Sequence, residues 1–271
     1  MTPLQEHIYQ ILIVVDRVCE KHGIPYFLFF GSAIGALRHK GFIPWDDDAD
    51  ICMLRPDYER FLKICATELP EGYSLQHFSV EPDFFFPIIR VLKTNVRIRL
   101  PAFENMPIRK NVYMDILSLD SLPKTVFEHR VQLFLRRWIR ILMEIKNVNH
   151  VAPRWRNRML VRFVRPFLNN YKLTRFQDRV SAWGRSNKSE YVWSADAPYS
   201  PKQVTFPRKW LERRRRVMFE NHEFWISADA EACLEKTYGD YMTPPPPEKQ
   251  ITHGCELLCD EISDESEEEK Q

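Results

Sequence analysis

Hydrophobic positions near the N-terminus follow first a helical and then a strand-like spacing. From Leu4 to His22 apolar side chains recur at i, i+3 and i+4, which predicts an amphipathic helix. Gly23 stands where this helix would end, because glycine readily adopts the left-handed conformation of a helix C-cap. The aromatic run Pro25–Phe30 predicts a short buried strand, and the stretch Ala33–His39 has helix-like spacing.

Strand and helix patterns continue to alternate in the next part of the chain. Gly41–Met53 predicts a turn that leads into a second strand, and Asp57–Leu69 returns to helical spacing. Further strands are predicted at Ile88–Leu92 and Val112–Leu117. This order of elements predicts an α+β fold.

The C-terminal half has a different character. Residues 127–180 are rich in Lys and Arg and show two helical stripes, one through Phe134 and Trp138 and one from Trp155 to Phe167. A more irregular, aromatic-rich section covers 189–239. We therefore expect a helical, basic C-terminal half beside the strand-containing first half.

Composition indicates a globular protein. The chain has 271 residues, of which 44% are hydrophobic and 13% aromatic, so it can bury a sizeable core. Its six cysteines show no dense framework and are interpreted as reduced thiols, and a zinc site built from His253, Cys255 and Cys259 is only weakly supported. The N-terminus lacks a signal-peptide pattern and no apolar run approaches the ~20 residues that span a bilayer, so a cytoplasmic protein is expected.

The net charge of +2 conceals a strong asymmetry along the chain. Between Phe127 and Arg216 there are 22 Lys and Arg against 6 Asp and Glu, a balance of +16, so the remainder carries −14. Residues 260–271 form an acidic end, which is typical of a disordered tail. The basic helices either cap the core with their arginines solvated or contact anionic lipid at the inner membrane face. Nucleic acid is not expected as a partner, because no nucleic-acid-binding motif is present.

An acidic run provides the clearest candidate chemistry. Asp46, Asp48 and Asp50 lead directly into the apolar stretch Ile51–Met53, so several carboxylates are held close together at the start of a strand. Residues two apart share a face of a strand, so Asp48 and Asp50 point the same way and Asp46 extends the row. A bound divalent cation relieves the repulsion between such carboxylates, and oxygen ligands suit Mg²⁺ or Mn²⁺.

Two further features join this acidic run. Asp115 lies between Met114 and Ile116 on another predicted strand, where a carboxylate is costly unless it is paired or coordinates a metal. Gly31 and Ser32 lie where a strand gives way to a helix, and backbone N–H groups at a helix start can bind phosphate. The sequence thus predicts a metal site at Asp48, Asp50 and Asp115, with Asp46 also catalytic and Gly31–Ser32 in a phosphate-binding turn.

These motifs resemble a known family. Gly31-Ser32, Asp48-Ala-Asp50-Ile and Met114-Asp-Ile116 look like the nucleotidyltransferase signature, and the block Pro44-Trp-Asp-Asp-Asp-Ala-Asp50 resembles the LicD family, which includes phosphocholine transferases and is related to fukutin-related protein. Glu20–Phe27 and Tyr238–Met242 extend the resemblance. It implies a nucleotidyltransferase-like mixed sheet core with flanking helices over 1–125. An accessory region over 126–253 packed on this core and an acidic disordered tail over 254–271 complete the expected organisation.

The resemblance also implies a reaction. A CDP-linked donor such as CDP-choline binds at Gly31–Ser32 and the metal, a hydroxyl of a glycan or glycolipid attacks the phosphorus that bears the choline, and CMP leaves. Asp48 and Asp50 hold the metal, and Asp115 binds a second ion or acts as general base. Contacts to phosphate oxygens are expected from the cations Arg38 and Lys40 with His39, and from Arg90 and Lys93.

Two other enzyme classes share these residues. A nucleotidyltransferase that uses an NTP and releases pyrophosphate would have the same site. A nucleotide-sugar glycosyltransferase also uses an Asp-x-Asp motif, but it usually has several βα units before the motif. Here one predicted helix and one predicted strand precede Gly31, which favours the nucleotidyltransferase-like interpretation.

Overall fold

A computed structural model describes residues 1–104, 106–147, 162–184, 189–250, 252 and 254–259 of the chain. Helix α1 (Pro3–His22) confirms the first predicted helix. It begins with a capping box, in which the Thr2 hydroxyl accepts from the Gln5 N–H at 3.2 Å and the Gln5 side chain accepts from the Thr2 N–H at 2.8 Å. It ends at Gly23 with φ of 58°, as expected for a C-cap glycine.

An eight-stranded mixed sheet holds the described elements together. Its strands are β1 (Phe27–Leu28), β2 (Asp50–Leu54), β3 (Tyr73–Gln76), β4 (Ile89–Arg99), β5 (Asn111–Ser121), β6 (Tyr191–Trp193), β7 (Thr205–Pro207) and β10 (Glu256–Cys259). The main order is β1-β2-β5-β4-β10, with β3 added beside β4 and β6 and β7 continuing from β5. Strands β2 and β5 pair in parallel, and the other described pairs are antiparallel.

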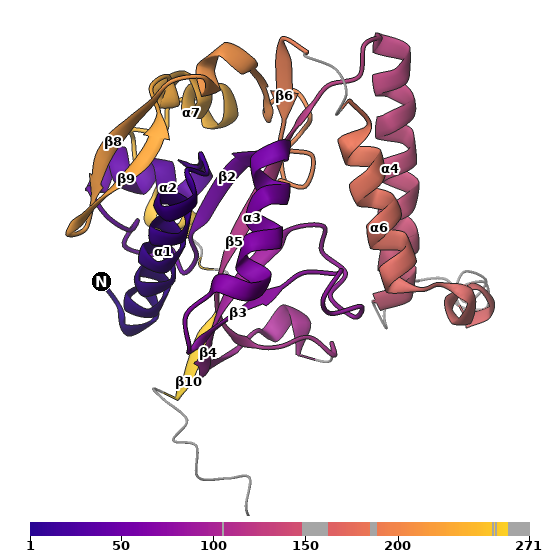
Figure 1. Ribbon diagram of the computed structural model, residues 1–271, viewed down its shortest axis with the longest axis horizontal. Coiled ribbons are helices and arrows are strands. Elements are labelled where there is room, and N and C mark those ends of the chain that lie inside the picture. The colour runs from indigo at the N-terminus through magenta and orange to yellow at the C-terminus, as the bar shows by residue number, and fades with distance from the viewer. Residues whose placement is uncertain (105, 148–161, 185–188, 251, 253, 260–271) are drawn as a thin grey trace, which may run out of the picture.

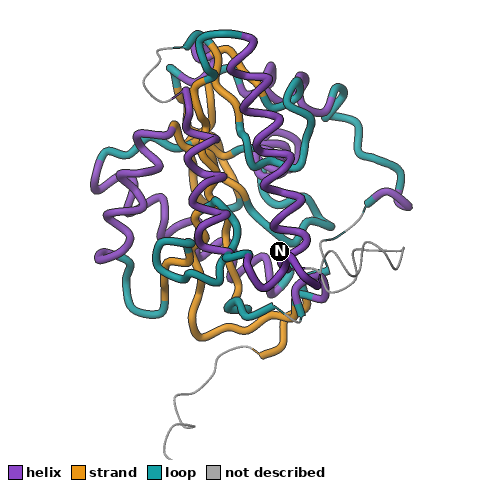
Figure 2. The backbone as a smooth tube through the Cα atoms, turned by 90° about the vertical axis from the view of Figure 1, so that its right-hand side faces the viewer, coloured by secondary structure: helices purple, strands orange, loops and turns teal. Residues whose placement is uncertain are grey.

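Helices cover this sheet on more than one side. The remaining elements are α2 (Phe30–Ile34), a π-helical turn (Gly35–His39), α3 (Arg55–Glu68), α4 (Val126–Asn147), α6 (Asn170–Ser181), α7 (Ala230–Tyr238) and a separate hairpin of β8 (Arg214–Phe219) and β9 (His222–Ser227). Short 3-10 turns lie at Pro101–Phe103, Arg165–Phe167, Ala182–Gly184, Arg208–Leu211 and Pro247–Lys249. Helices α1 and α3 lie along the sheet, while α4 and α6 stand beside each other on the side away from the β8–β9 hairpin (Figure 1, Figure 2).

The predicted α+β class is confirmed, with some differences in detail. The C-terminal half contains five strands as well as helices, because β6, β7 and β10 join the central sheet. The predicted disordered tail over 254–271 is wrong at its start, since Glu256–Cys259 pairs with β4 as strand β10. The second predicted basic helix, 155–167, lies largely outside the described residues, as does His253 of the weak zinc prediction.

Buried ion pairs connect α4 and α6 to the rest of the molecule. The Arg55 guanidinium donates to both carboxylate oxygens of Asp120, at 2.6 and 2.8 Å, and to Asp178 of α6 at 2.7 Å. The Arg136 guanidinium of α4 donates to Asp196 at 2.7 Å. Breaking one partner of such a buried pair leaves an uncompensated charge, so these pairs fix where the helices sit.

No described helix is both long and apolar enough to cross a membrane. The cysteines whose side chains are described, Cys19, Cys52, Cys65, Cys233 and Cys255, are free thiols.

Candidate active site

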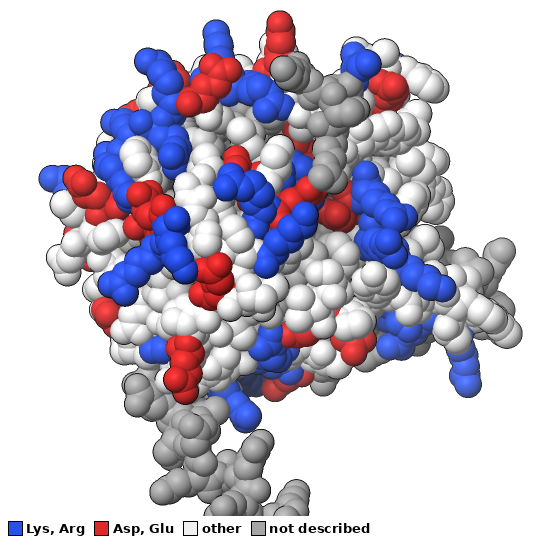
Figure 3. All heavy atoms as spheres, in the orientation of Figure 1, with Lys and Arg blue, Asp and Glu red and all other residues white. Residues whose placement is uncertain are grey.

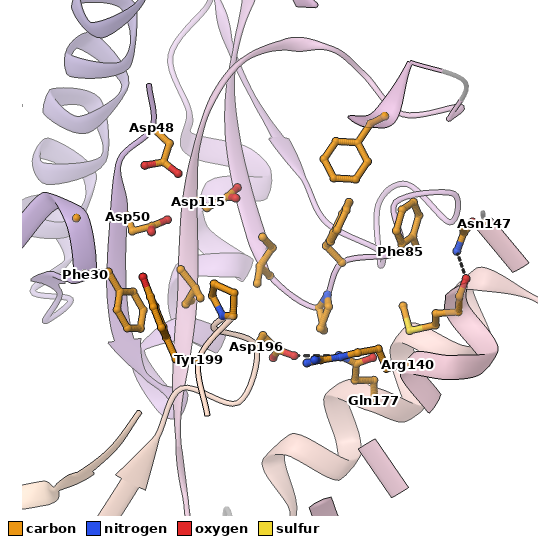
Figure 4. Close-up of a pocket in the computed structure, with 18 of the residues that line it drawn as sticks. Phe30, Asp48, Asp50, Phe85, Asp115, Arg140, Asn147, Gln177, Asp196 and Tyr199 are labelled. Atoms are coloured by element: carbon orange, nitrogen blue, oxygen red, sulfur yellow. Dashed lines mark hydrogen bonds between the residues drawn. The ribbon is translucent and has the colours of Figure 1, made fainter. Parts of the chain in front are cut away.

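Four carboxylates predicted from the sequence line one cavity of about 620 Å³. Strands β2 and β5 run in parallel with Asp50 directly beside Asp115, so the two side chains emerge at the same level of the sheet. Asp46 and Asp48 lie in the loop that leads into β2 and line the same cavity. Figure 4 shows Asp48, Asp50 and Asp115 directed into a common space.

Strand alternation explains why these acids reach the cavity. In β5 the neighbours Met114 and Ile116 are fully buried in the core that packs against α1. Successive side chains of a strand point to opposite faces, so Asp115 faces away from that core. The same rule applies to Asp50, whose neighbour Ile51 is fully buried in the same core.

The Gly31–Ser32 turn packs directly against the acids. A Cβ atom at Gly31 would lie 2.8 Å from the Asp46 carboxylate oxygen Oδ2, so a larger residue does not fit without a shift. Gly31 also lines the cavity, in keeping with its predicted place in a phosphate-binding turn. Ser32 is buried, does not line the cavity, and its hydroxyl accepts the Asp50 N–H at 2.8 Å. Ser32 therefore positions the start of β2.

The carboxylates act on one another electrostatically. Burial raises the pKa of Asp50 well above its usual range, and Asp48, Asp115 and Asp46 raise it further, while Arg90 opposes this. Each ionised neighbour makes a second negative charge more costly in a partly desolvated cavity. A cation placed among these groups would relieve that cost.

Arg90 supplies one positive charge at the site. Its guanidinium donates to both Asp115 oxygens, at 2.7 and 3.0 Å, and its carbon lies 3.6 Å from the centre of the Tyr113 ring. The Arg90 side chain is 4% exposed and that of Asp115 is 20% exposed, so the guanidinium is buried behind a carboxylate that reaches the cavity. Arg90 therefore fixes the direction of Asp115. Lys93, the other cation suggested with it, instead donates to Gln10 at 2.7 Å.

Three residues predicted to bind phosphate lie elsewhere. Arg38 donates to the backbone carbonyl of Tyr241 at 2.5 Å and to the His39 ring at 2.8 Å. Lys40 caps the π-helical turn with φ of 58°. None of the three lines the cavity. The structure does not bring Arg38, His39 and Lys40 to the acids.

The side chains in the cavity include oxygen donors that suit a divalent cation. Within the described ranges, no three His, Cys, Asp or Glu side chains come together as a ready metal-ligand set. The four acids do share one cavity, and carboxylate oxygens are the ligands that Mg²⁺ and Mn²⁺ prefer. The donor chemistry therefore fits such a cation, and binding requires the carboxylates to draw closer.

The rest of the cavity wall could not be located from the sequence. It comes from loops, from the start of α2, from α4 and α6 and from the end of α7, and includes Phe30, Phe85, Phe86, Phe103, Met143, Gln177, Asp196, Tyr199 and Tyr238. These residues are far apart in the chain and carry no common spacing. Tyr238 alone belonged to a segment noted for family resemblance, so the others had no usable sequence signal.

Comparison with known proteins shows which family this part of the chain resembles. The family model described as LicD/FKTN/FKRP, nucleotidyltransferase domain, matches residues 23–117, which contain all four acids and the Gly31–Ser32 turn. A lipopolysaccharide cholinephosphotransferase LicD from Haemophilus influenzae is 25% identical over 248 residues, covering 90% of this chain and 91% of that protein. Residues 23–117 are therefore similar to the nucleotidyltransferase domain of the LicD family, and most of the chain is similar to the Haemophilus protein.

Two uncharacterized proteins from Rickettsia are also similar. One from Rickettsia prowazekii is 26% identical over 181 residues, covering 62% of this chain and 64% of that protein. One from Rickettsia typhi is 34% identical over 70 residues, covering 26% of this chain and 23% of that protein. Neither adds a functional description.

Proposed function

We propose that this protein transfers a phospho-alcohol group, phosphocholine in the first instance, from a CDP-linked donor to a hydroxyl of a cell-surface glycan precursor. The observation that carries the proposal is the meeting of Asp46, Asp48, Asp50 and Asp115 in one cavity within the part of the chain matched by the LicD family model. The name of the Haemophilus relative, a lipopolysaccharide cholinephosphotransferase, supports phosphocholine as the group and a lipopolysaccharide precursor as the acceptor.

The reaction balances as a phosphoryl transfer. The acceptor oxygen forms a bond to the phosphorus that bears the choline, the bond from that phosphorus to the bridging oxygen of the diphosphate breaks, and CMP leaves. The hydroxyl proton passes to a carboxylate of the cluster. Such reactions depend mainly on positioning and on stabilisation of charge.

Each carboxylate has a place in this proposal. Asp48 and Asp50 would hold Mg²⁺ or Mn²⁺, with Asp46 assisting, and the bound ion would neutralise charge on the diphosphate. Asp115, oriented by its two hydrogen bonds from Arg90, would bind a second ion or accept the proton. Gly31 packs against Asp46 and lines the cavity in which the donor phosphates would bind.

CMP release from CDP-choline in the presence of Mg²⁺ or Mn²⁺ tests this function directly. Asp48→Asn should lower the rate by at least ~100-fold, on the order of the loss expected when a positioned charge is removed from an active site. Asp47→Asn is the matched control, because Asp47 belongs to the same acidic run but accepts from the Cys255 N–H at 2.9 Å and does not line the cavity.

The alternatives give different products in the same assay. Pyrophosphate released from an NTP, with every CDP donor inactive, would indicate a nucleotidyltransferase. Turnover of a nucleotide-sugar would indicate a glycosyltransferase. CMP released equally by wild type and Asp48→Asn would refute the role of the acidic cluster.

We also propose that α4 brings the enzyme to a lipid surface on the cytoplasmic side, where a glycolipid acceptor would lie. Phe127, Phe134 and Trp138 are 74%, 59% and 52% exposed, and Arg130 and Arg137 lie exposed on the same helix. Exposed aromatic side chains interleaved with arginines suit an anionic membrane interface. Figure 3 shows Lys and Arg side chains gathered over α6 beside it.

Flotation with vesicles tests this contact. The wild type should float with vesicles that contain anionic lipid and much less with purely zwitterionic ones, and the double variant F134S/W138S should lose this binding while it still releases CMP. Equal flotation of the wild type and the double variant would exclude α4 as the contact.

A further inference from the structure

Three aromatic rings line the cavity beside the acids. Phe30 is the first residue of α2, Tyr199 lies in the loop between β6 and β7, and Tyr238 ends α7. The ring centres of Phe30 and Tyr199 are 5.4 Å apart, as are those of Tyr199 and Tyr238. Figure 4 shows Phe30 and Tyr199 next to Asp50. Segments distant in sequence thus form one aromatic wall at the acidic end.

This wall is held firmly in place. The hydroxyls of Tyr199 and Tyr238 are hydrogen-bonded to each other at 2.8 Å. Phe30 is 3% exposed, and its ring also packs edge-on against Phe29 at 5.0 Å. Its φ of 46° is unfavourable for a bulky side chain and persists only where the surrounding structure enforces it, which occurs most often at functional sites.

The chemistry of the wall suits a cation that carries no hydrogen-bond donor. One of the two tyrosine hydroxyls donates to the other, which leaves a single O–H free, and the π-systems of both rings lie beside the cavity. A quaternary ammonium cannot donate a hydrogen bond, and it is recognised by aromatic rings together with nearby negative charge. Asp50 and its neighbours supply that charge.

We propose that Phe30, Tyr199 and Tyr238 form the subsite for the trimethylammonium end of the transferred group. This inference rests on the proposed function, since it assigns the part of the cavity that distinguishes choline from other alcohols. It makes these rings determinants of specificity that bind the donor without touching the transferred phosphorus.

Geometry favours this wall over the aromatic residues across the cavity. In phosphocholine only two carbons separate the phosphate oxygen from the nitrogen, so the ammonium must lie close to the carboxylates that hold the phosphate. Phe85 lies on the other side of the cavity from Asp50, near Asn147 of α4 (Figure 4). That distant end, with the polar side chains of Arg140 and Asn147, is left for the nucleotide or the acceptor.

Binding of CDP-choline and of CDP, measured by calorimetry with Mg²⁺ present, tests the subsite. Tyr199→Leu should weaken CDP-choline binding about tenfold or more, the effect of losing a desolvated cation–π contact, and leave CDP binding unchanged. Tyr199→Phe keeps the ring and should keep CDP-choline binding within about threefold of wild type, a small part of that contact. Unchanged CDP affinity also shows that Tyr199→Leu is folded.

The outcomes separate this subsite from the proposed function. An equal loss of CDP and CDP-choline binding in Tyr199→Leu would place the nucleotide on this wall and overturn the proposal. Undiminished CDP-choline binding in that variant would overturn it as well. If the wild type releases CMP only from CDP donors without a quaternary ammonium, transfer from CDP donors stands and the ammonium subsite is refuted. If no CDP donor is used, both fail.

Discussion

Replacing Asp50 by asparagine is expected to stabilise the metal-free protein while it abolishes activity. Burial and three neighbouring carboxylates raise the pKa of Asp50 well above its usual range, so its ionised form is held at a cost in the folded state. The asparagine side chain has almost the same shape as the carboxylate and carries no charge. The substitution therefore separates the destabilising effect of the clustered carboxylates on folding from their proposed role in catalysis.

The expected gain follows from the environment of the carboxylate. Leaving a buried group without full compensation costs about 1–3 kcal/mol, and Arg90, which pairs with Asp115, offsets only part of this for Asp50. We therefore expect Asp50→Asn to raise the free energy of unfolding by ~1–3 kcal/mol in EDTA. For a chain of this size that corresponds to an increase in Tm of roughly 2–10 °C.

The gain should depend on pH in a defined direction. Because the folded pKa of Asp50 lies above the unfolded one, the folded state binds more protons between the two values, and stability falls as pH rises through that window. The difference in Tm between Asp50→Asn and wild type should be largest near neutral pH and shrink on acidification. Mg²⁺ should raise the Tm of the wild type and have little effect on the variant.

Thermal melts in EDTA and in Mg²⁺, from pH 5 to 8, measure these effects. Asp47→Asn serves as the control, because it removes the same charge from the same acidic run outside the cavity. A metal-free Asp50→Asn protein that melts below the wild type at neutral pH would refute the reasoning. It would mean that hydrogen bonds to the Asp50 carboxylate outweigh the repulsion.

Three other substitutions test separate parts of the structure. Arg55→Met should destabilise the protein by ~3–5 kcal/mol in urea unfolding, because it leaves buried acids unpaired, whereas Arg60→Met, at an exposed ion pair, should cost about 1 kcal/mol or less. Burial and the Arg55 charge lower the pKa of His77 to about 3, so stability should fall by up to ~1.4 kcal/mol per pH unit below pH 6.5, and His77→Gln should remove this acid sensitivity. Gly31→Ala should lower the rate of CMP release with little change in Tm, since its methyl group would meet the Asp46 carboxylate oxygen at the end of a flexible side chain. Unchanged CMP release would argue against close approach of the donor to Gly31.

The acidic cluster could be predicted from the sequence because its residues lie in short motifs with a strand-like spacing. Asp48 and Asp50 stand two apart before an apolar strand, and Asp115 interrupts a second one. Strand alternation alone then indicates that each acid leaves the core. Their meeting required a parallel β2–β5 pair, which the sequence did not predict and which places Asp50 beside Asp115.

Other features depend on contacts between distant segments and leave no local trace. Arg38 follows the Gly31–Ser32 turn in sequence, yet its guanidinium donates to the Tyr241 carbonyl, 203 residues away. Tyr199 lies in an irregular loop, and only the packing of that loop against α2 and α7 places its ring beside the acids. Strand β10 was not predicted from the sequence, because the acidic residues 260–271 follow it directly.

The helical region forms part of the wall of the candidate active site. Asp196 lines the cavity and is held by Arg136 of α4 at 2.7 Å and by Gln177 of α6 at 3.0 Å. Arg55, at the start of α3 and directly after β2, reaches Asp178 on the same α6. Each link is a buried charged or polar contact, which is costly to break and therefore restricts the helices to one position. The wall that α4 and α6 contribute is thus fixed relative to the carboxylates, as the proposed two-substrate phosphoryl transfer would require.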